Sequence, residues 1–302
     1  MKISPLEYFR KIREIAIIAM FSDDYLMNRL VLKGGNLLDI VYKISDRTSL
    51  DLDFSIEDDF NREELDKIEI KLEKVLQTTF NEEGFIVFDF KFFEKPKRRP
   101  YNAADFWGGY KINLKIIEKD KLDNLGDKSL ASMRRNASTI AGAQKRTFTI
   151  DISKYEYCKA KQTRELNDYM IHVYSLPMIV FEKLRSICQQ MPEYKRISRT
   201  IKPTGRSRDF FDIYTILENK KFSFEPTTPE NIELLKLIFQ AKQVPLEFLK
   251  KIKEQRCRDF HEQDFVLLKI TIKPNAKIRD FSFYYDYVVK KSLLLEKSLG
   301  IV

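Results

Sequence analysis

The sequence predicts an α+β protein, in which a mixed β-sheet domain with flanking helices (1–175) is followed by a mostly α-helical domain (176–302). Two observations support this prediction. Strand-like runs alternate with helical patterns in the first half, whereas after Pro177 apolar residues recur mainly at helical spacing. The chain of 302 residues is 43% hydrophobic and 13% aromatic, so it is long and apolar enough to bury a core.

The first half of the chain is expected to contain both helices and strands. Residues 5–30 carry an apolar helical stripe, and the helical pattern at 61–80 begins at Asn61, a residue type that caps helices. A short helix is expected at 37–44, directly after a glycine pair. Strands are expected at 50–54, 85–93, 109–117 and 146–153.

The second half is expected to be helical. Its apolar periodicity predicts helices at 177–191, 206–219, 229–242, 245–256 and 278–298. A linker is expected from Phe222 to Pro229, which contains two prolines. We expect this helical domain to complete a cleft whose other wall is the sheet.

Composition excludes several classes of site. The three cysteines, Cys158, Cys188 and Cys257, are too few and too far apart for a disulfide framework or a zinc site. The two histidines have no metal-ligand partner at a useful spacing. The apolar run at 15–21 is too short to span a bilayer, so a cytoplasmic protein without membrane association is expected. A net charge of +9 is compatible with a polyanionic partner.

The most informative segment joins a glycine pair to two aspartates. Gly34 and Gly35 let the backbone approach a phosphate closely, and the helix that follows offers its N-terminus to an anion. Asp51 and Asp53 lie two residues apart, on the same face of the predicted strand. Such a pair suits a hard cation such as Mg²⁺, which leaves room for phosphate oxygens. These are the parts of a metal-dependent nucleotidyl transfer site; the alternative is a solvated edge strand after a tight turn.

A third acid and a lysine extend this candidate site. Asp151 lies in the strand at 146–153 and could join the metal ligands, or could simply face water at a strand end. Lys183 lies beside the apolar face of the helix at 177–191, where it either meets phosphate oxygens or reaches out to solvent. Asp209 and Asp212 share one face of the next helix.

A basic loop joins the two helices that carry these residues. Residues 194–208 contain six basic residues and no acid, which suits a phosphate-rich substrate but also an ordinary solvated loop. A second basic loop is expected at 95–99. The candidate acceptor-binding residues of the longer loop are Arg196, Arg199, Lys202, Arg206 and Arg208.

The pattern as a whole resembles the nucleotidyltransferase superfamily and, within it, the AbiEii/AbiGii family of nucleotidyltransferase toxins. The resemblance spans about residues 30–215. It depends on the order and spacing of four elements: Lys33-Gly34-Gly35, Arg47-x-Ser49-x-Asp51-x-Asp53, Glu182-Lys183-Leu184-Arg185 and Arg208-Asp209-Phe210-Phe211-Asp212. One departure is Asn36, where the superfamily more often has a small hydroxyl residue.

The resemblance implies a role for each matching residue. Asp51 and Asp53 would bind Mg²⁺ or Mn²⁺, with Asp151 as a further candidate ligand, and Asp209 would complete the catalytic set with Lys183. The residues implied in binding a nucleoside triphosphate are Lys33, Gly34, Gly35, Asn36, Arg47, Ser49, Lys183 and Asp212.

The family resemblance also implies a biological setting. Its members are toxins of bacterial toxin–antitoxin or abortive-infection (phage defence) systems, so a cognate antitoxin is an expected partner. Transfer of a nucleotide to the 3′ end of tRNA is the expected reaction, with release of pyrophosphate. Two alternatives remain open: transfer to a protein or small molecule, and a non-catalytic nucleic-acid-binding module.

Overall fold

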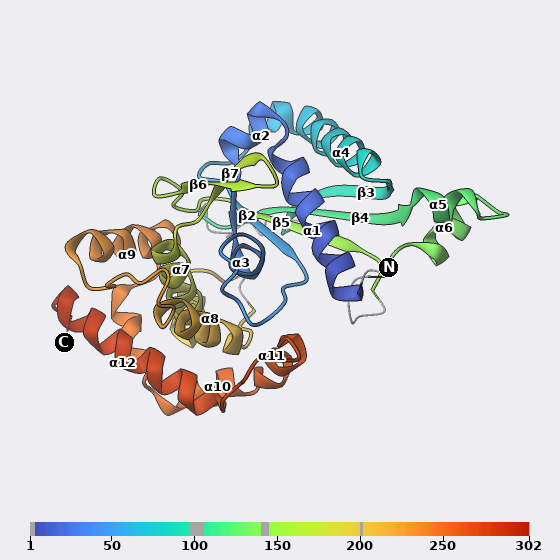
Figure 1. Cartoon of the computed structure of the whole chain (residues 1–302). Helices are drawn as coiled ribbons and strands as arrows, with labels where there is room; N and C mark the ends of the chain where they lie inside the picture. Colours follow the sequence, from blue (N-terminus) through green and yellow to red (C-terminus); the bar gives the residue numbers. More distant parts are fainter. Residues whose placement is uncertain (1–3, 97–105, 140–144, 200–201, 302) are drawn as a thin grey trace.

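A seven-stranded mixed β-sheet forms the centre of the N-terminal half (Figure 1). The computed structural model describes residues 4–96, 106–139, 145–199 and 202–301. Across the sheet the strand order is β3-β4-β5-β2-β1-β7-β6, with β2–β5 and β1–β7 parallel and the other pairs antiparallel. The strands are β1 (Val31–Lys33), β2 (Leu52–Ser55), β3 (Phe85–Lys95), β4 (Gly109–Glu118), β5 (Phe148–Ser153), β6 (Gln162–Leu166) and β7 (Tyr169–Val173).

The register of the three middle strands places charged residues side by side. Asp53 on β2 pairs with Lys33 on β1 and with Asp151 on β5. Leu52 and Phe54 are fully buried, as expected for alternate residues that face the core. Leu50 was expected to join them, but it precedes the strand and is 36% exposed. The strand register therefore places Asp53 between Lys33 on one side and Asp151 on the other.

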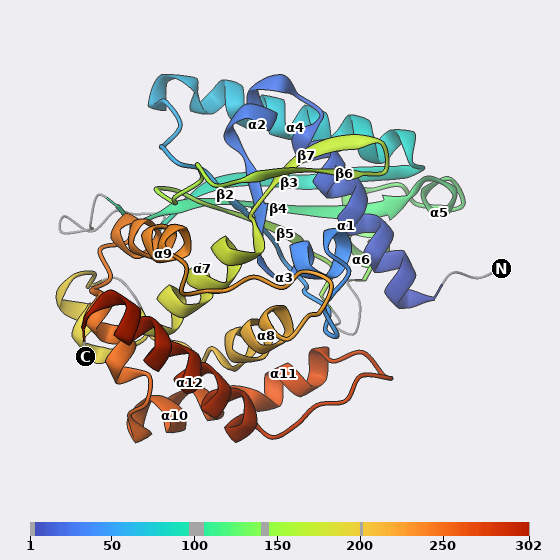
Figure 2. The ribbon, with the colours of Figure 1, turned by 60° about the vertical axis from the view of Figure 1, so that its left-hand side comes forward.

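Helices cover both faces of this sheet (Figure 2). In the N-terminal half they are α1 (Pro5–Phe21), α2 (Asp24–Arg29), α3 (Gly34–Asn36), which continues into a π-helical turn (Leu37–Val41), α4 (Leu65–Glu82), preceded by a 3₁₀ turn (Arg62–Glu64), α5 (Lys119–Asp123) and α6 (Leu130–Asn136). Helix α1 packs against α4, and α4 packs against β3. The single helix expected at 5–30 is wrong, because the Asp23 side chain accepts from the backbone N–H groups of Tyr25 and Leu26 and starts a second helix.

The C-terminal half is helical, as predicted. Its elements are α7 (Leu176–Cys188), a 3₁₀ turn (Pro192–Arg196), α8 (Ser207–Leu217), α9 (Pro229–Ala241), a second 3₁₀ turn (Leu246–Lys251), α10 (Gln255–Glu262), α11 (Phe265–Thr271) and α12 (Phe281–Leu299). The one helix expected at 245–256 is wrong, since a 3₁₀ turn fills most of that range and α10 begins only at Gln255. Helix α8 packs between α7 and α12, and the Phe210 ring lies 5.3 Å from that of Phe281.

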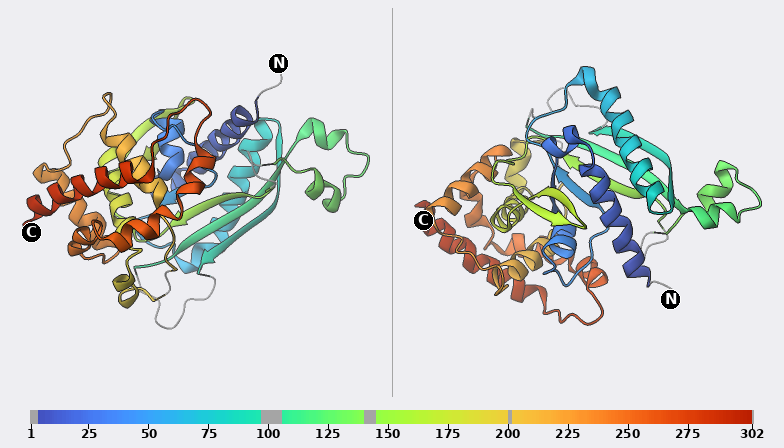
Figure 3. Two further views of the ribbon diagram at one scale, coloured as in Figure 1. Left: turned by 90° about the horizontal axis from the view of Figure 1, so that it is seen from below. Right: turned by 45° about the horizontal axis from the view of Figure 1, so that its top comes forward.

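One continuous hydrophobic core includes residues of both halves, so the sheet and the helices pack directly on each other. Strand β7 ends at Val173 and α7 begins at Leu176, but the domain boundary at 175/176 stays a prediction. The segment that carries α5 and α6 projects from one end of β4, away from the helical half (Figure 3). A small separate core of Phe88, Ile117 and Ala137 lies at its base. The architecture confirms the predicted α+β class.

The C-terminal half also reaches back to the turn before β2. The backbone N–H of Thr48 donates to the carbonyl of Thr271 over 2.9 Å, and that of Lys273 donates to Asp46 over the same distance. The Lys273 ammonium contacts Asp39 at 2.8 Å. The turn that leads into the aspartate strand is therefore held by residues that come more than 200 positions later. Within the part of the chain that the structure describes, no helix is long and apolar enough to cross a membrane.

Arg13 ties α1 to the glycine turn. Its guanidinium is 1% exposed and donates to Asn36 Oδ1 (2.6 Å), Asp39 Oδ2 (3.1 Å) and the Ser49 carbonyl (3.2 Å). A buried arginine with these acceptors fixes the distance between the first helix and the segment that carries the candidate site.

We predict that Arg13→Met destabilises the fold by about 3–5 kcal/mol, because it leaves buried acceptors without their donor. Arg10→Met is the matched control, since Arg10 lies one turn away in α1 and makes only a half-exposed pair with Glu14. It should cost at most about 0.5 kcal/mol. Urea unfolding of both variants measures the difference, and equal midpoints would show that Arg13 does not hold the turn.

Candidate active site

A cavity of about 850 Å³ lies between the sheet and the helical half. Its lining brings together residues that are far apart in the sequence. Of the predicted site residues, it includes Lys33, Gly34, Gly35, Arg47, Ser49, Asp51, Asp53, Asp151, Lys183, Arg206, Arg208 and Asp209. Those that do not line it are Asn36, Asp212, Arg196, Arg199 and Lys202. The cleft expected between the two halves is thus present.

Both positions of the turn require glycine, because neighbouring side chains occupy the space that a Cβ atom would need. Gly34 has φ +77°, and a Cβ there would lie 2.5 Å from Asp53 Oδ2. A Cβ on Gly35 would lie 2.8 Å from Arg47 Nη2 and 3.0 Å from Ser49 Cβ. The missing side chains therefore leave room for Asp53 and Arg47 to stand directly over the turn.

Asn36 does not take the phosphate-binding role that the sequence suggested. Its side chain is fully buried; Nδ2 donates to the Asp51 carbonyl over 2.6 Å, and Oδ1 accepts from Arg13. With both ends of the amide engaged, Asn36 positions the backbone of Asp51 from beneath the cavity. The earlier expectation is corrected to a positioning role.

The two aspartates of the strand differ in their surroundings. Asp53 is half-buried, and the loss of water around its carboxylate raises its pKa; Lys33 opposes the shift, Asp151 and Asp51 add to it, and the pKa reaches about 7. The Asp51 side chain is 49% exposed. Asp151 is paired with Lys95 at 2.8 Å and with Lys111 at 3.2 Å. The row of acids is thus partly neutralised by lysines on neighbouring strands.

These acids fit a divalent cation of the Mg²⁺ type. Carboxylate oxygens are its preferred protein ligands, and it is commonly held by one or two carboxylates plus substrate phosphates. In the described ranges of the chain, no three acids, histidines or cysteines come close enough together to hold a metal by themselves. Two carboxylates would suit a cation shared with a phosphate, and metal binding by Asp51 and Asp53 stays a prediction. The assignment of Asp151 stays a prediction.

Lys183 is a buried residue, so the alternative of a solvent-reaching lysine is wrong. It is 4% exposed, and its Nζ lies 2.8 Å from Asp209 Oδ1 and 2.7 Å from Asp212 Oδ2. Burial alone would lower the pKa of this ammonium, but Asp209 and Asp212 outweigh it and raise the pKa. Lys183 therefore presents a fixed positive charge at the cavity wall.

Asp212 lies behind this wall and not in the cavity. Arg47 binds it in a bidentate manner, Nε to Oδ1 at 2.7 Å and Nη2 to Oδ2 at 2.5 Å. Burial would raise the pKa of Asp212, but Arg47 and Lys183 lower it to about 2. The predicted nucleotide contact of Asp212 is corrected: its carboxylate orients the two cations that line the cavity.

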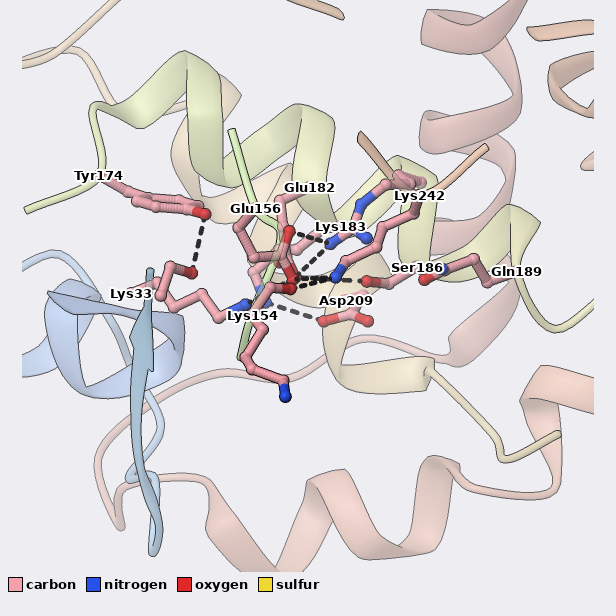
Figure 4. Close-up of polar contacts among 12 residues, drawn as sticks. Lys33, Lys154, Glu156, Tyr174, Glu182, Lys183, Ser186, Gln189, Asp209 and Lys242 are labelled. Carbon is pink, nitrogen blue, oxygen red and sulfur yellow. Dashed lines mark hydrogen bonds and ion pairs between the residues drawn. The ribbon is translucent and has the colours of Figure 1, made fainter. Parts of the chain in front are cut away.

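A second buried charge network, which the sequence did not reveal, forms another part of the wall (Figure 4). Glu156, 6% exposed, contacts Arg185 at 3.2 Å, Lys33 at 3.3 Å and Lys242 at 3.6 Å. Glu182 lies 3.1 Å from Arg185. Lys33 is therefore occupied by carboxylates, although it still lines the cavity. No local signal marks Glu156 or Lys242, because each matters only through partners distant in sequence.

The basic loop divides into two parts. Arg206 and Arg208 line the cavity, and the Nε atom of each is buried without a hydrogen-bond partner among the described residues. Arg196, Arg199 and Lys202 are exposed and lie outside the cavity lining. Residues 97–99 of the other predicted basic loop fall outside the described residues. The structure thus places two arginines, without an ion pair among the described residues, at the site itself.

Comparison with known proteins agrees with this geometry. The family model described as "Nucleotidyl transferase AbiEii toxin, Type IV TA system" matches residues 16–287. The chain belongs to the AbiEii family. It is accordingly a nucleotidyltransferase of a toxin–antitoxin system, with a nucleotide substrate and an antitoxin partner.

A solved structure gives a more distant similarity to this AbiEii-family chain. It is the crystal structure of an antigenic nucleotidyltransferase-like protein from Paracoccidioides brasiliensis, with 14% sequence identity and a TM-score of 0.37. The match covers 88% of this chain and 94% of that one. Comparison with the curated proteins found no match.

We predict that Lys183→Ala in this AbiEii-family enzyme lowers both stability and activity. Removing the ammonium leaves the buried carboxylates of Asp209 and Asp212 without this cation, which costs about 3–5 kcal/mol of folding free energy. Nucleotide transfer by the folded fraction should fall by about 10² or more, as for loss of one charge-stabilising donor. Lys183→Arg should not restore it, because a planar fork places its charge elsewhere.

The control for Lys183 is Lys236→Ala, which removes a half-exposed lysine from helix α9. Thermal unfolding and transfer are measured for all three variants. Normal transfer by Lys183→Ala would show that this charge has no part in catalysis.

Asp53 should make the metal-free protein less stable as pH rises. Its pKa is about 7 in the folded protein, above the ordinary value of 3.8, so the folded state binds more protons between these values and loses stability as pH increases through them. In a chelating buffer Asp53→Asn should therefore raise the melting temperature at pH 8, with the gain vanishing near pH 4. In a separate assay with Mg²⁺ the same substitution should abolish transfer. The exposed Asp58→Asn is the control; a gain independent of pH would contradict the assignment.

Proposed function

We propose that this AbiEii-family toxin uses Mg²⁺ to transfer a nucleoside monophosphate from a nucleoside triphosphate to the 3′-terminal hydroxyl of tRNA. One observation carries the proposal. One cavity is lined on its sheet side by the acids Asp51 and Asp53. On its helical side it is lined by the buried Lys183 and by Arg206 and Arg208, two arginines without an ion-pair partner in the described chain. A nucleotide with its cation matches both signs of charge.

The metal would be held by Asp51 and Asp53. When bound there, Mg²⁺ would polarise phosphoryl oxygens and offset the charge of the carboxylates. The Gly34-Gly35 turn lines the cavity, and its backbone N–H groups would donate to phosphate oxygens there. Ser49, which lines the cavity beside this turn, supplies a hydroxyl donor.

The helical wall would stabilise the leaving group. The acceptor oxygen forms a bond to the α-phosphorus, and the bond from that phosphorus to the bridging oxygen of the β-phosphate breaks. Pyrophosphate leaves, and the hydroxyl proton passes to solvent water. Lys183 remains protonated throughout, because Asp209 and Asp212 raise its pKa, so it acts as a charge and not as an acid. Arg206 and Arg208 add fixed positive charge for the β- and γ-phosphates.

An RNA acceptor is supported by the charge outside the cavity. Arg196, Arg199 and Lys202 are exposed on the segment that leads to Arg206, and the chain carries a net charge of +9. Modification of the tRNA end would stop translation in the cytoplasm, where both substrates occur, which suits a toxin of phage defence held in check by its antitoxin.

The experiment incubates the purified protein with each labelled nucleoside triphosphate, Mg²⁺ and total tRNA. We expect label in the tRNA band, released pyrophosphate, and loss of both with Asp51→Asn, whereas the exposed Asp58→Asn transfers normally. Acceptor binding should weaken steeply with salt, since phosphate contacts release counterions. Label in a protein or small molecule, indifferent to salt, would replace the tRNA assignment, and no metal-dependent turnover with any nucleotide would reject transferase activity.

A further inference from the structure

One end of the cavity has no role in the transfer mechanism. Lys183, Ser186 and Gln189 follow one another at one-turn spacing on α7 and just beyond its end, and all three line the cavity (Figure 4). Trp107 and Lys242 line it as well. Lys183 belongs to the phosphate side, so Gln189 lies about 9 Å further along the helix axis. That length is comparable to the reach from the phosphates of a nucleotide to its base.

The amide of Gln189 has a defined orientation. The Tyr194 hydroxyl donates to the Lys242 carbonyl at 2.5 Å, so its oxygen can only accept from Gln189, whose Nε2 lies 3.3 Å away. This leaves Gln189 Oε1 as an acceptor, and no hydrogen bond to it is found in the described parts of the chain. Gln189 is 5% exposed. Because Gln189 lines the cavity, this oxygen is available to accept a hydrogen bond from a ligand there.

Trp107 offers an apolar ring to the same cavity. It is half-buried and lines the cavity, and the Lys242 ammonium lies 5.5 Å from its ring centre. Lys242 is itself fixed, because its Nζ donates to the carbonyls of Lys154 at 2.5 Å and Phe106 at 3.2 Å. The same lysine accepts from Tyr194 through its backbone carbonyl. Lys242 therefore connects the Trp107 ring to the Tyr194–Gln189 pair.

We propose that Trp107 and Gln189 form a nucleobase subsite, which binds the base of the incoming nucleotide and selects bases that carry an exocyclic amino group. The indole offers a stacking surface to any base. Gln189 Oε1 accepts from the amino group, and a base that presents a carbonyl or a hydrogen there leaves this acceptor unpaired. The inference rests on the proposed function, since it assumes that Lys183 marks the phosphate end.

The test uses Trp107 as its own reporter, because it is the only tryptophan in the chain. Indole fluorescence is titrated with Mg²⁺ and nucleotides that differ mainly at one amino group: GTP against ITP, ATP against purine riboside triphosphate, and CTP against UTP. We expect quenching, with the amino-bearing member of at least one pair binding about tenfold tighter or more. Gln189→Met should reduce that preference to about twofold or less, since an apolar side chain accepts no hydrogen bond.

The matched control is Gln190→Met. Gln190 is the next residue, also buried, but its amide bonds to the Ser186 carbonyl and the Thr204 N–H, and it does not line the cavity. It should keep the preference between paired nucleotides. Because the wild-type pairs are compared first, the proposal can fail even if a variant does not fold.

Several results would overturn the subsite. They are equal binding of all pairs, a preference that survives Gln189→Met, or inorganic tripolyphosphate binding as tightly as the nucleotides. Quenching by an oligonucleotide ending in CCA that competes with the nucleotides would assign the subsite to the acceptor base instead. If transfer to tRNA continues in these cases, only the subsite is rejected; if no nucleotide binds or reacts, the proposed function fails as well.

Discussion

The buried carboxylate of Asp212 is the constraint on which the site depends. It binds Arg47 from the turn before β2 and Lys183 from α7, while its own helix, α8, packs against α7. A group this deeply buried is stable as an anion only when cations surround it, and those cations are stable only beside it. The same three side chains therefore join the two halves of the chain and place Arg47 and Lys183 at the cavity.

A second consequence of this arrangement is that the charges of the cavity are balanced before any substrate arrives. Lys95 and Lys111 neutralise Asp151, Glu156 neutralises Lys33 and Arg185, and Asp209 holds Lys183. Among the predicted site residues that line the cavity, no ion pair is found within the described chain for Asp53, Arg206 or Arg208. A bound triphosphate therefore needs to break few of the ion pairs within the protein. The charged side chains that surround it need little rearrangement during the reaction.

The sequence predicted those parts of the site whose residues lie close together along the chain. Asp51, which directly precedes β2, and Asp53 within it are two residues apart, and the glycine pair precedes them; spacing alone identifies both. Lys183 and Asp209 were identified by their positions on helix faces and given their roles by the family resemblance, but the ion pair between them was not predicted. Glu156 was missed because its partner Lys33 lies 123 positions away, and long-range pairs leave no periodic signal. The role of Asn36 was misassigned for the same reason, since Arg13 lies 23 positions before it.

Fold prediction failed where elements are short or polar. Strand β1 has three residues, and β6 is largely exposed with the sequence Gln-Thr-Arg-Glu-Leu, so neither shows the alternation of a half-buried strand. Helices α7, α8, α9 and α12 and strands β3, β4 and β5 were placed correctly because burial imposes their periodicity, whereas the short strand β7 was not predicted. A helix cap at Asp23 and a 3₁₀ turn at Leu246–Lys251 interrupt a helix without interrupting the apolar periodicity of the sequence, so the sequence does not reveal them.

The order in which the helical wall is synthesised has a consequence for the cell that makes this toxin. The ribosome delivers the sheet and its aspartates first, and domains form largely in that order. Lys183, Asp209 and the segment that bonds to Thr48 emerge only later, so a growing chain holds acids without the cations that complete the cavity. The complete cavity therefore exists only after the second half has folded onto the first, late in translation.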